Sequence, residues 1–325
     1  MSLGVAIIGA GLIGNKRAAA LPDGVTLRAV FDEAADRAAA LASAYPHAVA
    51  ASTLEAALDN PGVGLVIVAT PHHQLAPIGV AAVRCGRDVL LEKPGAHRLD
   101  ALLELQAAAA EARRRVRVGF NHRFHPSFLR SRDLIASGTY GDVFSIRGRY
   151  GHGGRPGYEK EWRAQRAISG GGELIDQGLH LIDLVRYLVG DVELAFSELR
   201  TDFWPMEVED NAYLALRGRA GAFAWLHASW TEWKNIFSFE VAMREAKLDV
   251  QGLGGSYGTE RLTLYEMSPE MGPPPATSWE WPQPDASWSL ELADVVSDLE
   301  GGTSIGADLA DCIAAFRVVE EAYGR

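Results

Sequence analysis

The stretch that decides the fold lies near the N-terminus and reads Val5-Ala6-Ile7-Ile8-Gly9-Ala10-Gly11-Leu12-Ile13-Gly14. A strand that is buried on both faces reads as a continuous apolar run, and residues 5–8 form such a run. The glycines that follow have the spacing G-x-G-x-x-G, and residues 15–21 favour a helix. Strand, glycine turn and helix in this order predict a dinucleotide-binding turn.

Each glycine has a separate physical task in such a turn. Gly9 permits the tight turn, Gly11 lets the backbone approach a pyrophosphate, and Gly14 allows the helix to pack closely on the strand. The helix N-terminus offers N–H groups to the phosphates. We therefore expect the whole loop, including Leu12 and Ile13, to contact a cofactor. The alternative interpretation is a glycine turn with no ligand.

An acidic residue ends the second apolar run. Asp32 stands 18 residues after Gly14, where a carboxylate can accept hydrogen bonds from ribose hydroxyls. A carboxylate at this place repels a 2′-phosphate, so the sequence favours NAD over NADP. Arg37 is expected beside the same ribose, and Arg37 and the pair Lys16-Arg17 leave a phosphate-binding alternative open.

The same alternation continues through the first 120 residues. Apolar runs at 27–31, 65–69, 89–91 and 116–120 alternate with helix-like stretches at 33–44, 54–58, 76–85 and 99–115. This order predicts an α/β fold whose first domain, residues 1–122, is a Rossmann-type, doubly wound parallel sheet.

The pattern changes after residue 122. Strand-like stretches follow one another at 143–150, 193–202, 211–217, 222–230, 237–242 and 247–251. Successive strands without crossover helices predict a C-terminal α/β domain, residues 123–304, on a large, mostly antiparallel open sheet. The proline-rich stretch 269–284 is expected to be an irregular surface loop. Residues 305–323 are expected to form a helix.

Composition excludes several classes of protein. The chain has 325 residues, 48% of them hydrophobic, and a formal net charge of −11, which argues against a nucleic-acid partner. Two distant cysteines, Cys85 and Cys312, argue against a disulfide framework and a cysteine-built metal site. No apolar run is long enough to span a membrane, and because Met1-Ser2-Leu3 leads straight into a predicted strand, we expect no signal segment. We expect a cytoplasmic protein without a metal.

A first chemical motif follows the run at 89–91. Glu92-Lys93-Pro94 ends that predicted strand, and ligands of open parallel sheets bind beyond the carboxyl ends of the strands. Lys93 is therefore expected near a substrate. An exposed lysine after a strand is the alternative.

A second motif begins at Gly170-Gly171-Gly172 and continues into a predicted helix. Asp176 and His180 are four residues apart on it, so they lie on one helical face and can reach the same small molecule. A histidine can accept an alcohol proton near neutral pH. Asp183 and Tyr187 extend the same stripe. The alternative is a solvated helix face.

Together these motifs resemble a known family. The glycine turn, the Glu92-Lys93-Pro94 triplet, Asn121-x-Arg123-Phe124-x-Pro126, Trp162-Arg163, and the three glycines before Asp176-x-Gly178-x-His180 occur in order. The chain resembles the glucose–fructose oxidoreductase/inositol dehydrogenase/MocA (Gfo/Idh/MocA) family over essentially its whole length.

The resemblance implies roles for individual residues. Lys93 would polarise the substrate oxygen, His180 would be the general acid/base, and Asp176 would hold the reacting hydroxyl. It also places Arg123, Trp162 and Arg163 among the residues that bind substrate, and Thr70, Pro71, His73, Glu92 and Lys93 among those that bind the cofactor. One departure is that Thr70-Pro71 is followed by His72-His73 where the family often has an asparagine and a later histidine.

The resemblance further implies an NAD(P)-dependent oxidoreductase acting on a hydroxyl or carbonyl carbon of a sugar, polyol or sugar derivative. Its C-terminal sheet would form a homodimer or homotetramer, and residues 305–323 would pack on the first domain. Two alternatives stay open: a hydrolase or lyase that uses tightly bound NAD by transient oxidation, and a non-catalytic nicotinamide-binding sensor.

Overall fold

The computed structural model describes residues 3–270 and 272–325. They form two compact units. The first comprises the chain up to Asn121 together with Trp288–Ile313, and the second comprises His122–Ser287 and Ala314–Arg325. Helix α10 (Leu309–Ala322) therefore begins in the first unit and ends in the second.

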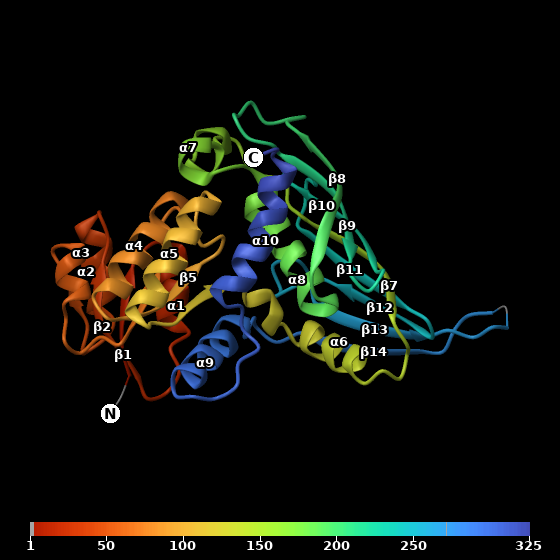
Figure 1. Ribbon diagram of the computed structural model, residues 1–325, viewed down its shortest axis with the longest axis horizontal. Helices are drawn as coiled ribbons and strands as arrows, with labels where there is room; N and C mark the ends of the chain where they lie inside the picture. Colours follow the sequence, from red (N-terminus) through yellow and green to blue (C-terminus); the bar gives the residue numbers. More distant parts are fainter. Residues whose placement is uncertain (1–2, 271) are drawn as a thin grey trace. The chain divides into compact units, whose positions relative to one another are not determined.

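The first unit contains a six-stranded parallel sheet in the order β3-β2-β1-β4-β5-β6. Figure 1 shows helices lying against the strands of this sheet. Its strands are β1 Leu3–Ile8, β2 Val25–Phe31, β3 Val49–Ala50, β4 Leu65–Val68, β5 Asp88–Glu92 and β6 Val116–Gly119. The helices between them are α1 Leu12–Ala19, α2 Ala35–Ser43, α3 Leu54–Leu58, α4 His72–Arg84 and α5 Leu99–Ala112. The strand order reverses at β1 and β4, and ligands bind beside such a switch point.

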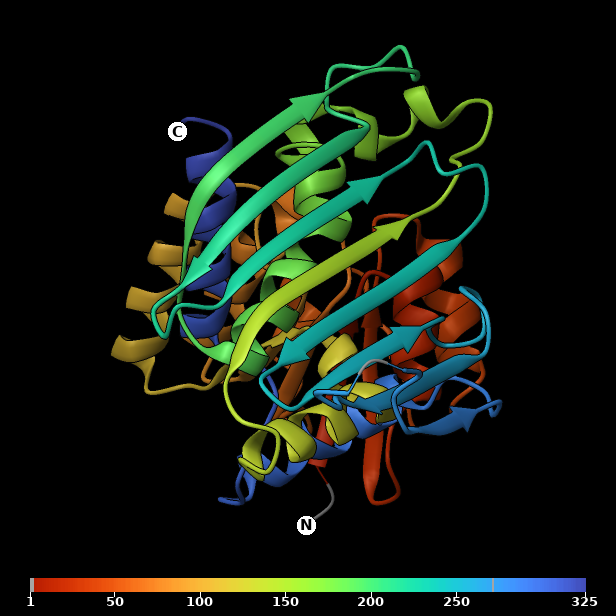
Figure 2. The same ribbon diagram turned by 90° about the vertical axis from the view of Figure 1, so that its right-hand side faces the viewer.

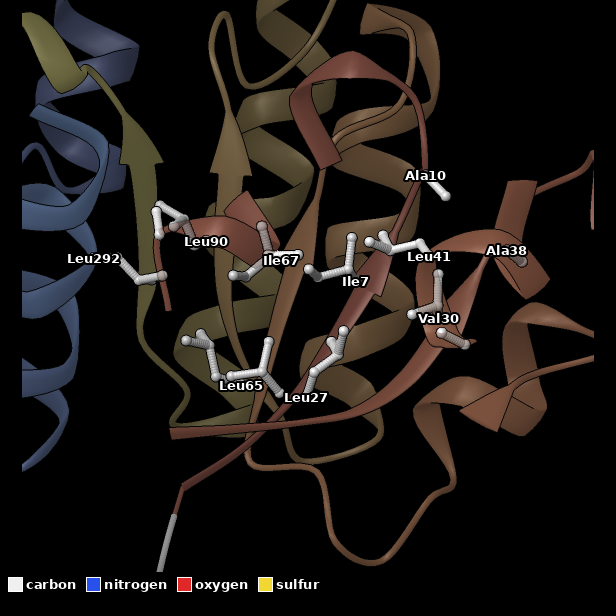
Figure 3. Close-up of a cluster of buried hydrophobic side chains, with 14 of the residues drawn as sticks. Ile7, Ala10, Leu27, Val30, Ala38, Leu41, Leu65, Ile67, Leu90 and Leu292 are labelled. Atoms are coloured by element: carbon white, nitrogen blue, oxygen red, sulfur yellow. The ribbon is translucent and has the colours of Figure 1, made fainter. Parts of the chain in front are cut away.

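A parallel sheet must be covered on both faces, and one face is covered partly from a distant part of the sequence. The apolar cluster in Figure 3 joins Ile7, Ile67 and Leu90 of the sheet to Leu41 of α2 and to Leu292 of α9 (Ser287–Leu299). Helix α9 therefore completes the apolar core of the first unit, although almost 170 residues separate it from β6.

The second unit contains an eight-stranded sheet in the order β14-β13-β12-β11-β7-β10-β9-β8. Its pairings are antiparallel except that of β7 with β10. The strands are β7 Val143–Gly151, β8 Val192–Arg200, β9 Asn211–Gly218, β10 Phe223–Ser229, β11 Ile236–Met243, β12 Ala246–Gln251, β13 Glu260–Glu266 and β14 Ala276–Trp281.

Helical segments of this unit lie on one face of its sheet. The longer ones are α6 Pro126–Ala136 and α8 Leu179–Val189, and the short ones are η1 Asn121–Phe124, η2 Tyr158–Lys160, η3 Trp162–Ala164, α7 Arg166–Ser169 and η4 Leu174–Gly178. Buried side chains such as Leu226 and Phe239 lie on that face, because they surround the Cβ position of Gly148 together with Leu181 of α8. Figure 2 looks onto the opposite face, over which the described part of this unit places no helix.

The predicted fold class is confirmed, with a parallel first sheet and a large, mostly antiparallel second sheet. One prediction needs correction, and some elements were not predicted. The stretch 269–284 is not wholly a loop, because β14 lies within it and pairs with β13 along its length. The short strand β3, both of whose residues are exposed, had no apolar run to reveal it.

An arginine fully buried in the first unit connects three of its elements. Arg17 of α1 donates from Nε to Glu92 Oε1 of β5 at 2.5 Å, and its Nη1 lies 2.6 Å from Glu291 Oε2 of α9. Its guanidinium also stacks 4.6 Å from the ring centre of Trp288. Burial lowers the pKa of Arg17, but the charges of Glu92 and Glu291 outweigh this and raise it above its ordinary value.

Replacing this arginine should destabilise the protein strongly. Arg17→Met removes the positive charge that pairs with two buried carboxylates, and breaking a buried ion pair by removing one partner costs about 3–5 kcal/mol. The matched control is Arg98→Met, which breaks only the exposed ion pair of Arg98 with Asp100 and should cost about 0–1 kcal/mol. Urea unfolding followed by circular dichroism measures both variants. Equal midpoints for the two variants would contradict the importance given to the buried cluster.

Candidate functional site

The glycine turn has the geometry that its sequence predicts. Gly9 adopts φ +96°, and a Cβ on it would lie 2.6 Å from the carbonyl oxygen of Ala69. A Cβ on Gly14 would lie 1.9 Å from the carbonyl oxygen of Gly9. Gly11 differs, because no atom of the described residues, apart from Gly11 itself and its two chain neighbours, lies within 4 Å of its Cβ position. Packing therefore requires Gly9 and Gly14, whereas at Gly11 the turn leaves open space for a ligand.

Asp32 ties the turn to the end of β2. Its carboxylate accepts hydrogen bonds from the backbone N–H of Ala10 at 2.7 Å and of Ala34 at 2.8 Å. Arg37 donates to it from Nη2 at 2.6 Å, and this arginine side chain is 56% exposed. Burial raises the pKa of Asp32, but the bonds from Arg37 and the two backbone amides lower it below its ordinary value. The carboxylate is therefore ionised at neutral pH.

Other predicted cofactor residues of the first unit present groups that suit a ligand. Leu12 is 75% exposed despite its apolar side chain. Thr70 Oγ1 and His73 Nδ1 are buried and have no hydrogen-bond partner among the residues described. Pro71 lies between them as the N-cap of α4. Buried polar atoms without partners are rare, so these residues fit a bound polar molecule.

In the Glu92-Lys93-Pro94 motif, Glu92 takes part in a buried ion pair, whereas Lys93 lies just beyond the end of the strand. The carboxylate of Glu92 is directed to Arg17 and is nearly fully buried, so its observed partner belongs to the protein. Lys93 follows directly after β5, and its peptide bond to Pro94 is cis. Glu92, the residue directly before Lys93, is thereby attached to the buried cluster, and its part in cofactor binding stays a prediction.

In the second unit, Asp176 lies on a π-helical turn. The segment Leu174–Gly178 is this turn, and α8 begins directly after it with Leu179 and His180. Asp176 and His180 are both nearly fully buried, so the alternative of a solvated helix face is wrong. A π turn is rare and often occurs at functional sites, and the sequence predicted an ordinary α-helix here.

Asp176 has a cationic neighbour from an earlier segment. Arg163 Nε lies 3.3 Å from Asp176 Oδ2, and the Arg163 guanidinium stacks on Trp162 at 4.4 Å from the ring centre. The structure thus brings together Trp162, Arg163 and Asp176, which were all predicted to bind substrate.

The rest of the predicted stripe has a different task. Asp183 binds Arg123 through two bonds, at 2.6 and 2.9 Å, and both side chains are buried. Arg123 also lies over the ring of Tyr187 at 5.2 Å. A bidentate buried pair is a strong, oriented contact. Asp183 and Tyr187 therefore anchor η1 to α8, and substrate binding by Arg123 stays a prediction.

The glycine turn before the π segment is held by residues that sequence reasoning missed. Glu209 Oε1 accepts from the N–H groups of Gly172 at 2.9 Å and Leu174 at 3.1 Å, and from Tyr323 Oη at 2.6 Å. Burial raises the pKa of Glu209. A Cβ on Gly171 would lie 1.9 Å from Tyr323 Oη, which explains that glycine. Glu209 and Tyr323 had no local signal, because both are distant from the turn in sequence.

Within 3–270 and 272–325, no three His, Cys, Asp or Glu side chains are arranged to hold a metal ion. No helix in those ranges combines the length and the apolar character needed to cross a membrane.

Comparison with known proteins gives consistent relatives. A levoglucosan dehydrogenase of Pseudarthrobacter phenanthrenivorans is 31% identical over 212 residues, which are 62% of this chain and 54% of that protein. A 1,5-anhydro-D-fructose reductase of Ensifer adhaerens is 30% identical over 67% of this chain and 66% of its own length. The matched regions therefore span about half to two thirds of these curated relatives.

The fold also has close solved counterparts. The crystal structure of GenD2 from gentamicin A biosynthesis, in complex with NAD, superposes with a TM-score of 0.84 at 26% identity. The superposition covers 99% of this chain and 93% of that chain.

Two family models divide the chain between them. Residues 3–120 match the oxidoreductase family with an NAD-binding Rossmann fold, and residues 128–249 match the GFO/IDH/MocA C-terminal domain. Both models describe one family, and together they cover more than two thirds of the sequence. The chain therefore belongs to the Gfo/Idh/MocA family of oxidoreductases.

Proposed function

We propose that this protein is an NAD-dependent dehydrogenase that oxidises a hydroxyl of a sugar or polyol, or reduces the corresponding carbonyl. Family membership and the names of the relatives support this reaction class. The single observation that carries the proposal is the buried pair Asp176 and His180 on one helical segment. The dinucleotide turn in the same chain would supply the redox partner.

The first unit fits a nicotinamide dinucleotide. The open space at Gly11 and the N-terminus of α1 would take the pyrophosphate. Asp32, ionised at the end of β2, would accept hydrogen bonds from ribose hydroxyls, which supports NAD over NADP. The buried Thr70 Oγ1 and His73 Nδ1 would find partners on the bound molecule. When bound, this cofactor accepts or returns a hydride.

The residues of the chain would manage the proton and the substrate oxygen. His180 would take the hydroxyl proton during oxidation and return it during reduction. The ammonium of Lys93 would stabilise negative charge that develops on the same oxygen. Asp176, oriented by Arg163, would accept a hydrogen bond from the reacting hydroxyl. A neutral sugar or polyol presents the hydroxyls that these groups recognise.

We further propose that the protein is a homo-oligomer through the second sheet. Phe196 of β8 and Trp225 of β10 stack with ring centres 6.0 Å apart. Trp225 precedes Leu226, whose side chain lies on the side of α8, so the stack is on the opposite face of the sheet. Both stacked residues pair with Ala215 of β9, so the two rings meet over this small side chain. They are 46% and 44% exposed. A second copy of the same face would bury these rings.

Cofactor preference gives the first test of the proposal. NADH should bind more tightly than NADPH by about tenfold, because Asp32 repels the extra phosphate by about 1–2 kcal/mol. Fluorescence titration measures both affinities, and Asp32→Ser should narrow the ratio. Equal or tighter binding of NADPH would contradict the assignment and favour the exposed Arg37 as a phosphate ligand. Arg17 is no alternative, because it is buried between two carboxylates.

The catalytic assignment is tested by three substitutions. His180→Ala should keep its affinity for NADH and lower kcat by about 10²- to 10⁴-fold, the usual contribution of a positioned base. Lys93→Met should lose comparable activity, and Asp176→Asn should also raise KM. NADH formation is followed by absorbance with levoglucosan and inositol, and NADH consumption with 1,5-anhydro-D-fructose.

The same assay separates the other reaction classes. Turnover without net NADH would indicate internal redox by bound NAD, and NADH binding without turnover of any polyol would indicate a sensor. A folded His180→Ala variant that turns over substrate at the parental rate would remove His180 from the mechanism.

The oligomer is tested by charge in the aromatic stack. Trp225→Glu should shift the protein to a smaller assembly, because an interface cannot bury an unpaired carboxylate without a large cost. Analytical ultracentrifugation gives the mass of each variant. Met267→Glu is the matched control, since Met267 is 47% exposed and lies outside the stack. An unchanged mass for Trp225→Glu would contradict the proposed interface, as would a monomeric parent protein.

A further inference from the structure

A second histidine stacks on the proposed acid/base. The ring centres of His122 and His180 are 3.7 Å apart and their planes differ by 20°. The two histidines come from η1 and from the second residue of α8, so 58 positions of sequence separate them. Both side chains are buried. His122 occupies the variable position of the motif Asn121-x-Arg123-Phe124, and the sequence pattern assigned it no role.

His122 is itself held by a frame of rings in the second unit. Tyr150, Phe237 and His125 surround it, with ring centres at 5.2, 6.2 and 5.6 Å. His125 is fixed in turn, because its Nδ1 lies 2.8 Å from Glu260 Oε2. Burial raises the pKa of Glu260, but the hydrogen bond from His125 and the other contacts of this carboxylate outweigh burial and lower the pKa below its ordinary value. The flat ring of His122 therefore lies between these surrounding rings and the imidazole of His180.

Ring orientation matters for a proton-transfer group. The second side-chain torsion of histidine is broad rather than confined to sharp staggered wells. A general base must nevertheless keep its nitrogen within hydrogen-bond reach of the proton that it takes. A flat ring stacked on one face of the His180 imidazole restricts rotation about that torsion, because rotation would drive the edge of the imidazole into the ring of His122.

We infer that His122 is a positioning residue for His180, and that its flat ring, rather than its ability to carry a proton, is what the reaction requires. This inference rests on the proposed function of His180. It adds to that function a residue from η1, next to Arg123, whose guanidinium anchors the same segment to α8 through Asp183.

Two substitutions of His122 separate the ring from the proton. His122→Ala removes the stacked ring and should lower kcat by about 10- to 100-fold, as expected when a catalytic group is misplaced by about 1 Å. KM and NADH affinity should change little. His122→Phe keeps a flat ring and no titratable nitrogen, and it should restore most of the lost kcat. Steady-state kinetics with NAD and the active polyol, and fluorescence titration with NADH, measure these quantities.

The matched control removes a similar stack between two strands of the second sheet, β9 and β10. His227 stacks on Tyr213 at 4.3 Å on the other face, so His227→Ala should keep the parental kcat. Thermal melting of all three variants shows whether His122→Ala has lost stability, and His122→Phe tests the inference if it has.

The outcomes are distinct from failure of the proposed function. If His180→Ala is inactive while His122→Ala retains the parental kcat, the inference is wrong and the acid/base assignment stands. If His122→Phe is as slow as His122→Ala although folded, the stacking role is overturned and proton transfer by His122 replaces it. If His180→Ala is fully active, the proposed function fails first.

Discussion

The buried guanidinium of Arg17 is the interaction on which the first unit depends. One charge satisfies Glu92 and Glu291, and three elements that are distant in sequence are tied to one point. Arg17 lies on the helix that follows the dinucleotide turn, and Glu92 immediately precedes Lys93. A Cβ on Gly119 of β6 would lie 2.5 Å from Arg17 Nη2, so the neighbouring strand is shaped around the same side chain. The proposed phosphate-binding turn and the proposed catalytic lysine thus both lie next to residues of this one buried ion-pair cluster.

Sequence patterns predict the parts of this protein that depend on local chemistry. Residues 5–8 and 65–69 read as buried strands because parallel strands bury both faces, and the structure confirms both. Gly9 and Gly14 could be assigned from spacing alone, since the backbone atoms that crowd them belong to the same turn or to the neighbouring strand. The pair Asp176 and His180 was found because helical spacing places both on one face.

The remaining parts depend on contacts between residues that are far apart in the chain. Arg17 was considered for phosphate binding, yet its two carboxylates come from β5 and α9, which no local pattern connects to α1. Glu209 and Tyr323 shape the turn before Asp176 from a distance in sequence. Glu209 lies 37 positions after Gly172, and Tyr323 lies 152 positions after Gly171. Strand β14 was hidden because prolines flank it, and prolines are tolerated at a sheet edge, where β14 lies.

The parallel pairing of β7 with β10 has a consequence for how the second unit assembles. Strand β7 is central in the sheet, with β11 on one side and β10 on the other, but it is the first of the eight to be synthesised. Its nearer partner in sequence begins at Phe223, 72 positions after Gly151. Contacts over such separations close slowly, and an unpaired strand edge invites association with other chains. Arg147 and Arg149 place charge on β7 while its partner strands are still to be synthesised, and charged residues oppose edge-to-edge aggregation.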